Sequence, residues 1–338
     1  MRLGRTYGLL ALLVLLAVSA VGQDIHFSQF ARSPMNLNPG MSGRFDGDWR
    51  LVSNSRQQWR SVSNPYRTFG GSFDGHDILK VPELGAGLSI YQDRAGTSEF
   101  STLEANLALS YGIRLQGSPD HTINIGVQSG VTQRRINAAN LTFDNQWNGT
   151  RFDGSLGSNE LFTTTSHVYP NLNTGVFWTR TVEKRKTYSA GVALYNILKP
   201  DQSFFGASDI TLDRRLNIHA NTTHKLTGDL DLLPGVLFSG QGTYRELDLG
   251  TNLRYYLDKS PYAYKAVYVG AWTRLADAGY IVAGIDYNDL NISASYDFNY
   301  SPLRTASRWR GGLELALTWI IRTRLPERGR FKSCPDFL

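Results

Sequence analysis

The side chains best suited to acid–base or metal chemistry are six histidines and a number of scattered carboxylates. His219 and His224 are five residues apart, so on a strand they face opposite sides and cannot share a metal ion. His76 precedes Asp77, but adjacent residues on a turn rarely form a catalytic pair. A hydrolase centred on His219 and Asn221 would need a serine beside them, and none stands at a suitable position. We therefore expect no enzyme activity, no metal and no cofactor.

A second set of candidates consists of charged residues that strand alternation places on the polar side of the strands. They are Glu104, Arg114, Glu246, Asp248, Arg254 and Glu314. Charges that share an enclosed interior either pair with one another or line an ion-selective pore, and we favour structural pairing. Gly85–Ala86–Gly87 resembles half of a phosphate-binding loop, but it lies inside an alternating strand, where it indicates close backbone packing.

Strands must position these side chains, because period-two alternation is the strongest pattern in the sequence. In Leu103–Leu115, apolar residues alternate with polar or small ones along the whole segment. Such strands are longer than most soluble strands and match the thickness of a membrane. We predict an all-β transmembrane antiparallel β-barrel of about fourteen strands, an even number as bacterial barrels require. The segments are Trp49–Gln58, Tyr66–Asp74, Leu84–Gln92, Ser101–Leu115, Thr122–Arg134, Asn171–Val182, Thr187–Leu198, Arg215–Lys225, Leu232–Ser239, Tyr244–Leu257, Lys265–Leu275, Tyr280–Tyr287, Leu290–Asn299 and Arg308–Ile321.

The first 22 residues predict a secretory signal peptide. Arg2 and Arg5 precede the apolar stretch Leu9–Val18, and small residues lead to a cleavage point between Gly22 and Gln23. No later apolar stretch of about twenty residues follows, so a membrane can be crossed only by strands closed into a barrel. The chain has a net charge of +6 but no basic block, which argues against nucleic acid as a partner. The predicted location is the outer membrane.

Loop lengths support the membrane interpretation. Connections after even-numbered strands are all short, as expected for turns on the periplasmic side. The two long insertions, Ile136–Pro170 and Lys199–Arg214, both follow odd-numbered strands and would be extracellular. A soluble β-sandwich gives no reason for this asymmetry.

The chain divides into four regions: residues 1–22 as signal peptide, 23–48 as an N-terminal lead-in or plug, 49–324 as the barrel and 325–338 as a C-terminal tail. Residues 23–48 do not alternate, and they contain two prolines and scattered aromatic residues. The only cysteine, Cys334, lies in the tail, so no internal disulfide can form. That thiol either contacts a partner or is incidental.

Several short motifs carry a resemblance to one protein family. They are Gln23–Phe30 followed by Leu37–Gly40, then Arg56–Trp59, and near the end Gly270–Arg274 and Cys334–Pro335. In type and order these motifs resemble the PorP/SprF family, which belongs to the type IX secretion and gliding machinery of Bacteroidetes. The resemblance spans the chain beyond the signal peptide.

The resemblance implies a non-enzymatic outer-membrane component that anchors secretion machinery or assists export and surface attachment of a secreted adhesin-like protein. The implied partners are outer-membrane lipids, a periplasmic peptidoglycan-associated lipoprotein with secretion-ring components, and the C-terminal domain of a secreted adhesin. Asn38–Pro39 also resembles the Asn-Pro-Ala of fatty-acid channel barrels, whose N-terminus forms a hatch. Candidate partner or plug residues are therefore Phe27, Phe30, Asn38 and Pro39. The alternative function is a channel for small or hydrophobic solutes, of the fatty-acid-channel type.

Overall fold

The computed structural model describes residues 24–323, apart from 61–63, 97, 116, 138–140, 158–163, 184, 205–209, 261–262 and 303. The predicted signal peptide and the predicted tail with Cys334 lie outside the described residues. Parts of the two predicted long loops do so too.

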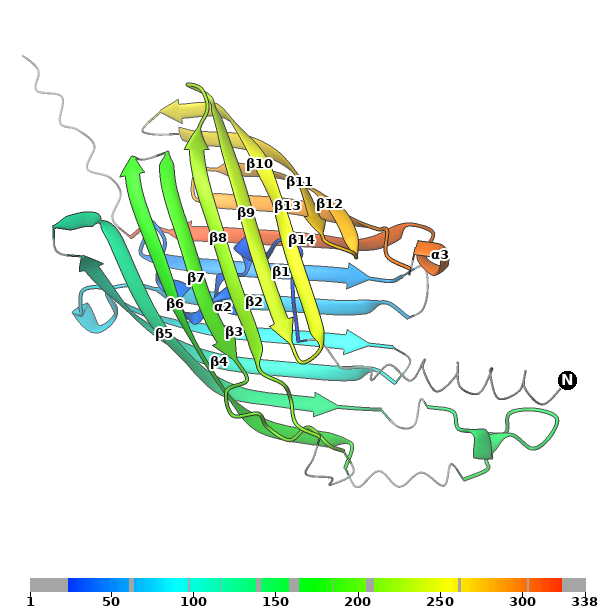
Figure 1. Cartoon of the computed structure of the whole chain (residues 1–338). Helices are drawn as coiled ribbons and strands as arrows, with labels where there is room; N and C mark the ends of the chain where they lie inside the picture. The colour runs from blue at the N-terminus through cyan, green and yellow to red at the C-terminus, as the bar shows by residue number, and fades with distance from the viewer. Residues whose placement is uncertain are drawn as a thin grey trace, which may run out of the picture.

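Fourteen antiparallel strands close into a barrel over the described residues (Figure 1). Each strand pairs with its neighbours in sequence, and β14 returns to pair with β1 along the whole of β1. The closed ring leaves no free strand edge, as a membrane requires. The strands are β1 (Trp49–Gln58), β2 (Tyr66–Gly75), β3 (Leu84–Ala95), β4 (Phe100–Leu115), β5 (Ser118–Arg135), β6 (Ser166–Glu183), β7 (Lys186–Tyr195), β8 (Arg215–Lys225), β9 (Leu230–Gln241), β10 (Tyr244–Ser260), β11 (Ala263–Arg274), β12 (Ala278–Tyr287), β13 (Leu290–Asn299) and β14 (Arg310–Ile321).

The predicted barrel and its fourteen segments are confirmed, with differences at some ends. The largest difference is the start of β6, which begins at Ser166 rather than Asn171. Proline usually ends a central strand, yet Pro170 lies opposite Val131 in the β5–β6 ladder. It is tolerated because the pairing of β6 with β7 begins only at Thr174, so this part of β6 has a neighbouring strand on one side only. Strand β7 ends at Tyr195 rather than Leu198, because Asn196 adopts a positive φ of 56°.

Side chains alternate between an apolar outer face and a polar inner face. On β4, Leu107 is 64% exposed, whereas its neighbour Ala108 is 1% exposed. None of the helices described is long and apolar enough to cross a membrane. Outward aromatic side chains near the two ends of the barrel include Tyr255, Tyr287, Trp319, Tyr296 and Phe298. An apolar outer band with aromatic residues toward both rims suits a lipid bilayer.

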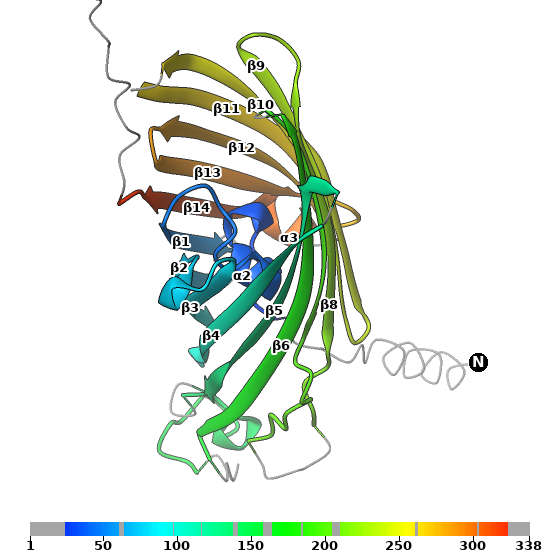
Figure 2. The same ribbon diagram turned by 90° about the vertical axis from the view of Figure 1, so that its left-hand side faces the viewer.

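The two ends of the barrel differ in the length of their connections. After even-numbered strands the connections are short, and the longest of them, 76–83, carries η3 (Ile78–Lys80). We call this the short-turn end. The connections 136–165 and 196–214 leave the opposite end, which we call the long-loop end (Figure 2). The former carries η5 (Asp144–Gln146), and α3 (Arg304–Ser307) precedes β14 at the same end.

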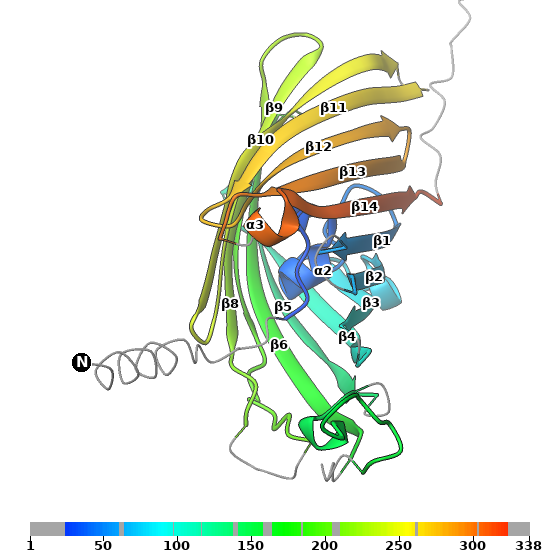
Figure 3. The same ribbon diagram turned by 90° about the vertical axis from the view of Figure 1, so that its right-hand side faces the viewer.

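The interior is occupied by residues 24–48, which we call the N-terminal segment (Figures 2 and 3). It contains η1 (Phe30–Arg32), α2 (Pro34–Leu37) and η2 (Pro39–Met41). Its first residue, Asp24, bonds to Asn196 and Gln241 at the long-loop end. Strand β1 begins at the short-turn end, so the segment runs through the length of the barrel interior.

Candidate functional site inside the barrel

The N-terminal segment is a chain of short helical turns set by its prolines. Pro34 and Pro39 each stand in the first turn of a helical element, where the missing N–H of proline costs no hydrogen bond. Between them, the Asn38 side chain accepts a hydrogen bond of 2.8 Å from the Gly40 N–H. These local features compact the segment so that it fits across the barrel.

The middle of the segment sits in a glycine-lined recess of the inner wall, formed by Gly126 on β5, Gly175 on β6 and Gly191 on β7. A Cβ added at Gly175 would lie 2.1 Å from Asn38 Oδ1, and one at Gly126 would lie 2.4 Å from the Gly40 nitrogen. No real Cβ fits at such distances, so the approach depends on glycine. Gly85 on β3 allows a similar close approach, because a Cβ there would lie 2.5 Å from the main-chain carbonyl oxygen of Ser42. The close packing predicted for Gly85–Ala86–Gly87 is confirmed.

Asn38 and Pro39, two of the residues singled out in the sequence, occupy this recess. Asn38 is fully buried, and its amide donates to the Val176 carbonyl at 2.9 Å and lies 3.2 Å from His219 Nε2. Pro39 is buried beside Gly126. His219 packs on Phe177 and faces Asn38, and no group of metal-binding side chains is found in the part of the chain that the structure describes.

Phe27 and Phe30, the other two predicted residues, are also buried against the inner wall. The Phe27 ring lies 6.4 Å from the Tyr91 ring, centroid to centroid. Phe30 packs with Leu37 and Leu237, and its ring meets the Trp272 ring edge to face at 5.5 Å. The structure therefore brings all four residues onto one segment–wall interface.

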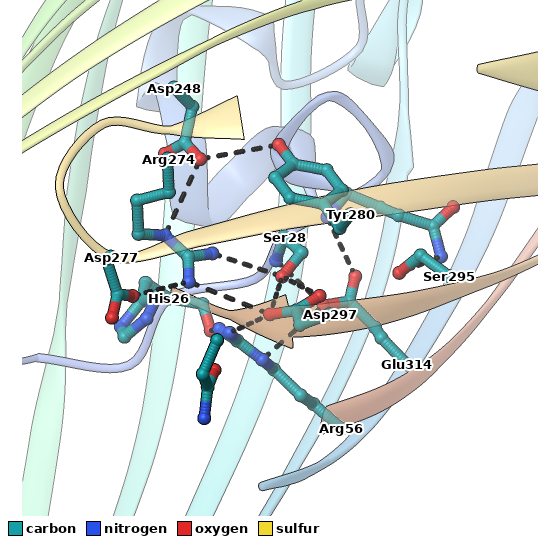
Figure 4. Close-up of polar contacts among 12 residues, drawn as sticks. His26, Ser28, Arg56, Asp248, Arg274, Asp277, Tyr280, Ser295, Asp297 and Glu314 are labelled. Atoms are coloured by element: carbon teal, nitrogen blue, oxygen red, sulfur yellow. Dashed lines mark hydrogen bonds and ion pairs between the residues drawn. The ribbon is translucent and has the colours of Figure 1, made fainter. Parts of the chain in front are cut away.

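Near the long-loop end the segment contacts a group of ionisable side chains, which we call the charged cluster (Figure 4). Arg274 Nε lies 3.2 Å from Glu246 and 3.5 Å from Asp248, and its Nη1 lies 3.6 Å from Asp297. The members are Arg56, Glu246, Asp248, Arg274, Asp297 and Glu314, and the side chain of each is 3% exposed or less. The cluster contains four carboxyl groups and two guanidinium groups.

Main-chain groups of the N-terminal segment supply hydrogen bonds to this cluster. Glu314 accepts from the Ser28 N–H at 2.7 Å and from the Gln29 N–H at 3.0 Å. The Ser28 hydroxyl donates to Asp297, and Arg56 donates to the His26 carbonyl at 3.0 Å. Donors from the segment thus satisfy carboxylates that the two guanidinium groups leave incompletely bonded.

The predicted pairing of inward charges holds for most of the set. Glu246, Asp248 and Glu314 belong to the charged cluster, and Arg254 pairs with Asp231 at 3.3 Å. Glu104 instead accepts a hydrogen bond from Asn106, its neighbour on the same face of β4. Arg114 lies at the short-turn rim, where its side chain is 69% exposed and pairs with Glu83 at 2.6 Å. It is therefore a rim residue, because β4 extends to that end of the barrel.

Sequence reasoning missed three members of the cluster, Arg56, Arg274 and Asp297. Each stands on the inner face by the same alternation that placed Glu314 there. A further signal was available for Arg56 and Arg274, since both belong to motifs that carry the family resemblance.

His26 in the segment is electrostatically constrained. Burial lowers the pKa of the His26 imidazole to about 4, and although Glu246 opposes this shift, the charges of Arg56 and Arg274 add to it. The ring is therefore neutral at pH 7.

We expect this shift to make the barrel less stable as the pH falls. The folded pKa of about 4 lies below the ordinary value of 6.5, so between these values the unfolded chain binds more protons than the folded one. Stability is then fully present above pH 6.5 and declines toward pH 4. Thermal unfolding of the barrel in detergent, followed at pH 7 and pH 5, should show a lower melting temperature at pH 5. The His26→Gln variant should show a smaller difference between the two pH values. An equal drop in both proteins would contradict this assignment.

Together, these features define a class of protein: a membrane-spanning β-barrel whose interior is filled by its own N-terminal segment. The family model described as type IX secretion system membrane protein PorP/SprF matches residues 19–319. The chain belongs to this family, and it is a membrane component of the outer-membrane β-barrel kind. No curated protein matches the chain significantly.

Solved structures with a similar fold are remote in sequence. The toluene transporter TbuX of Ralstonia pickettii is 10% identical, with a TM-score of 0.49, over 86% of this chain and 94% of that one. A FadL homologue of Pseudomonas aeruginosa is 11% identical, with a TM-score of 0.43, over 83% of this chain and 92% of that one. Values this low give no basis for transferring a solute or a mechanism.

Proposed function

We propose that the protein is a non-enzymatic outer-membrane component of the type IX secretion system. In this role it anchors secretion machinery on its periplasmic side and assists export or surface attachment of a secreted adhesin-like protein. The observation that carries the proposal is the family match over residues 19–319, which includes the N-terminal segment and all of the barrel but the last two residues of β14. An exported precursor, cleaved between Gly22 and Gln23, fits this location.

In this proposal residues 23–48 form a plug, residues 49–324 form the barrel and residues 325–338 form a C-terminal tail. Support comes from the contacts of Phe27, Phe30, Asn38 and Pro39, which fix the segment against the inner wall over its length. A filled interior suits a protein that binds others at its two ends better than one that passes solutes. The proposed partners are lipids around the barrel, a peptidoglycan-associated lipoprotein with ring components at the short-turn end, and the C-terminal domain of an adhesin at the long-loop end.

Deleting the long loops tests the division of partners. Because loops 136–165 and 196–214 both leave the long-loop end, we expect their removal to abolish co-purification of secreted protein from native outer membranes. The periplasmic lipoprotein should still co-purify, since its proposed contacts lie at the opposite end. As a matched control, the β9–β10 turn at Gly242 at the same end can be exchanged for another two-residue turn. Secreted protein retained after loss of both loops would refute the extracellular half of the proposal.

A further inference from the structure

The charged cluster binds main-chain groups of the N-terminal segment. Glu314 receives its two short hydrogen bonds from consecutive main-chain N–H groups, those of Ser28 and Gln29. These two residues form a turn just before η1, and the turn directs both N–H groups at one carboxylate, which an extended strand cannot do. Arg56 Nε lies 3.8 Å from the same carboxylate, beyond hydrogen-bond distance. A carboxylate buried to this degree requires such donors, so the site depends on a peptide turn lying against it.

Recognition at this site combines main-chain and side-chain contacts of the bound segment. Arg56 and Arg215 donate to the main-chain carbonyls of His26 and Ile25 at 3.0 and 2.9 Å. The Ser28 hydroxyl accepts from Arg274 and donates to Asp297, and the Gln29 side chain accepts from Ser293 at 2.7 Å. Contacts to main-chain atoms are available to any peptide, so a foreign segment with a hydroxyl residue followed by an amide residue can make the same set.

The site lies close to the long-loop end. Arg274 is the last residue of β11, and Arg56 and Glu246 are each the third residue from that end of β1 and β10. Residues 25–29 belong to no strand, so their release breaks no ladder of the barrel. A small cavity of about 20 Å³ adjoins them, lined by residues that include His26, Phe30 and Glu246, so a new occupant requires these residues to move out first.

Release of residues 25–29 removes both short hydrogen bonds from Glu314, which an incoming peptide must replace, but it leaves the other ion pairs of the cluster in place. Arg56 remains paired with Asp297 at 3.0 Å, and Arg274 remains paired with Glu246 and Asp248. The remainder of the segment stays anchored, because Asn38 and its neighbours sit in the glycine-lined recess. The first part can therefore detach while the rest still fills the barrel.

We propose that the charged cluster is a peptide-binding site, which residues 25–29 of this chain occupy and which an uncharged peptide of another protein enters by displacing them and forming the same turn. The ligand class is defined by two consecutive free N–H groups on one turn, with a hydroxyl side chain at the first position and an amide side chain at the second. Residues 25–29 therefore compete with the incoming peptide for the charged cluster. This inference stands apart from the secretion role and survives if that role is wrong.

The test measures binding of a fluorescent, end-blocked peptide with the sequence of residues 25–30 to the full-length protein in lipid nanodiscs. Ser28→Pro removes one N–H and the hydroxyl from the internal occupant, so the peptide should bind this variant about tenfold more tightly than it binds the unmodified protein. Adding Glu314→Gln to Ser28→Pro should cancel that gain. Adding Asp93→Asn should not, because Asp93 accepts from Thr68 elsewhere on the inner wall.

A matched ligand gives a second arm that does not depend on variants. A peptide methylated on the nitrogens that correspond to Ser28 and Gln29 cannot donate to Glu314, so its binding should be at least tenfold weaker. Equal binding of the methylated peptide would overturn the proposal. No binding to the Ser28→Pro variant would also overturn it, provided that the unheated barrel keeps its compact mobility on a gel. If the double variant Ser28→Pro with Glu314→Gln still bound the peptide as tightly as Ser28→Pro alone, the peptide would bind elsewhere. That result would also refute the proposal.

Discussion

Arg274→Met should destabilise the barrel by about 3–5 kcal/mol, the cost of leaving buried charges without their partner. The Arg274 guanidinium lies within 4 Å of carboxylates from β10, β13 and the loop before β12, namely Glu246, Asp248, Asp297 and Asp277. Methionine keeps the unbranched stem of the side chain and lacks the guanidinium group. The loss in free energy of unfolding therefore measures the cost of burying these carboxylates without their arginine partner.

Unfolding of the barrel in urea and detergent, followed by gel mobility and circular dichroism, measures this effect. Arg114→Met is the matched control, because that arginine pairs with Glu83 at 2.6 Å but is 69% exposed, and an exposed pair contributes less than about 1 kcal/mol. Combining Arg274→Met with Glu246→Gln and Asp248→Asn should recover most of the loss. If Arg274→Met is no worse than Arg114→Met, the cluster does not hold the barrel together.

The strands could be predicted from the sequence because their signal is local. Alternation in Leu103–Leu115 is visible without knowing any other strand, and it placed Glu246, Asp248 and Glu314 on the inner face. Strand ends were less certain because they depend on neighbours. Pro170 lies within β6 only because β7 does not reach that far, and no local pattern could show this.

The site was only partly visible in the sequence. Phe27, Phe30, Asn38 and Pro39 stood out as aromatic or turn-forming residues in a segment that does not alternate. The glycine-lined recess that holds them could not be recognised in the sequence. It is formed by single glycines on three different strands, and a lone glycine in a strand has many possible causes. Arg56, Asp297 and Arg274 come together only when β14 closes against β1. Contacts across a barrel depend on register and closure, which alternation alone does not specify.

The glycine-lined recess leads to the second large effect, displacement of the N-terminal segment by Gly175→Val. The new Cβ would stand 2.1 Å from Asn38 Oδ1, and valine has two further methyl groups. Neither the strand nor the fully buried Asn38 can move far enough within a paired barrel, so the segment should leave the recess. Loss of the Asn38 hydrogen bond to Val176 then removes about 1 kcal/mol, in addition to the lost packing.

Single-barrel conductance and protease sensitivity in liposomes give two independent readouts. The unmodified protein should conduct little, because the segment fills the interior from Asp24 to the start of β1. Gly175→Val should raise conductance at least tenfold and expose the segment to protease. Gly71→Val is the matched control: Gly71 also lies within a strand, but the nearest atom to its new Cβ would be 3.7 Å away on Phe69. The control should behave as the unmodified barrel does.

The comparison also separates the two proposed functions of the barrel. A plugged anchor requires that conductance be low and that it rise only when the recess is blocked. High conductance or solute uptake by the unmodified protein, unchanged by Gly175→Val, would instead favour the channel alternative. In that case the N-terminal segment would line a pathway, and its burial against the recess would serve to shape the passage rather than to close it.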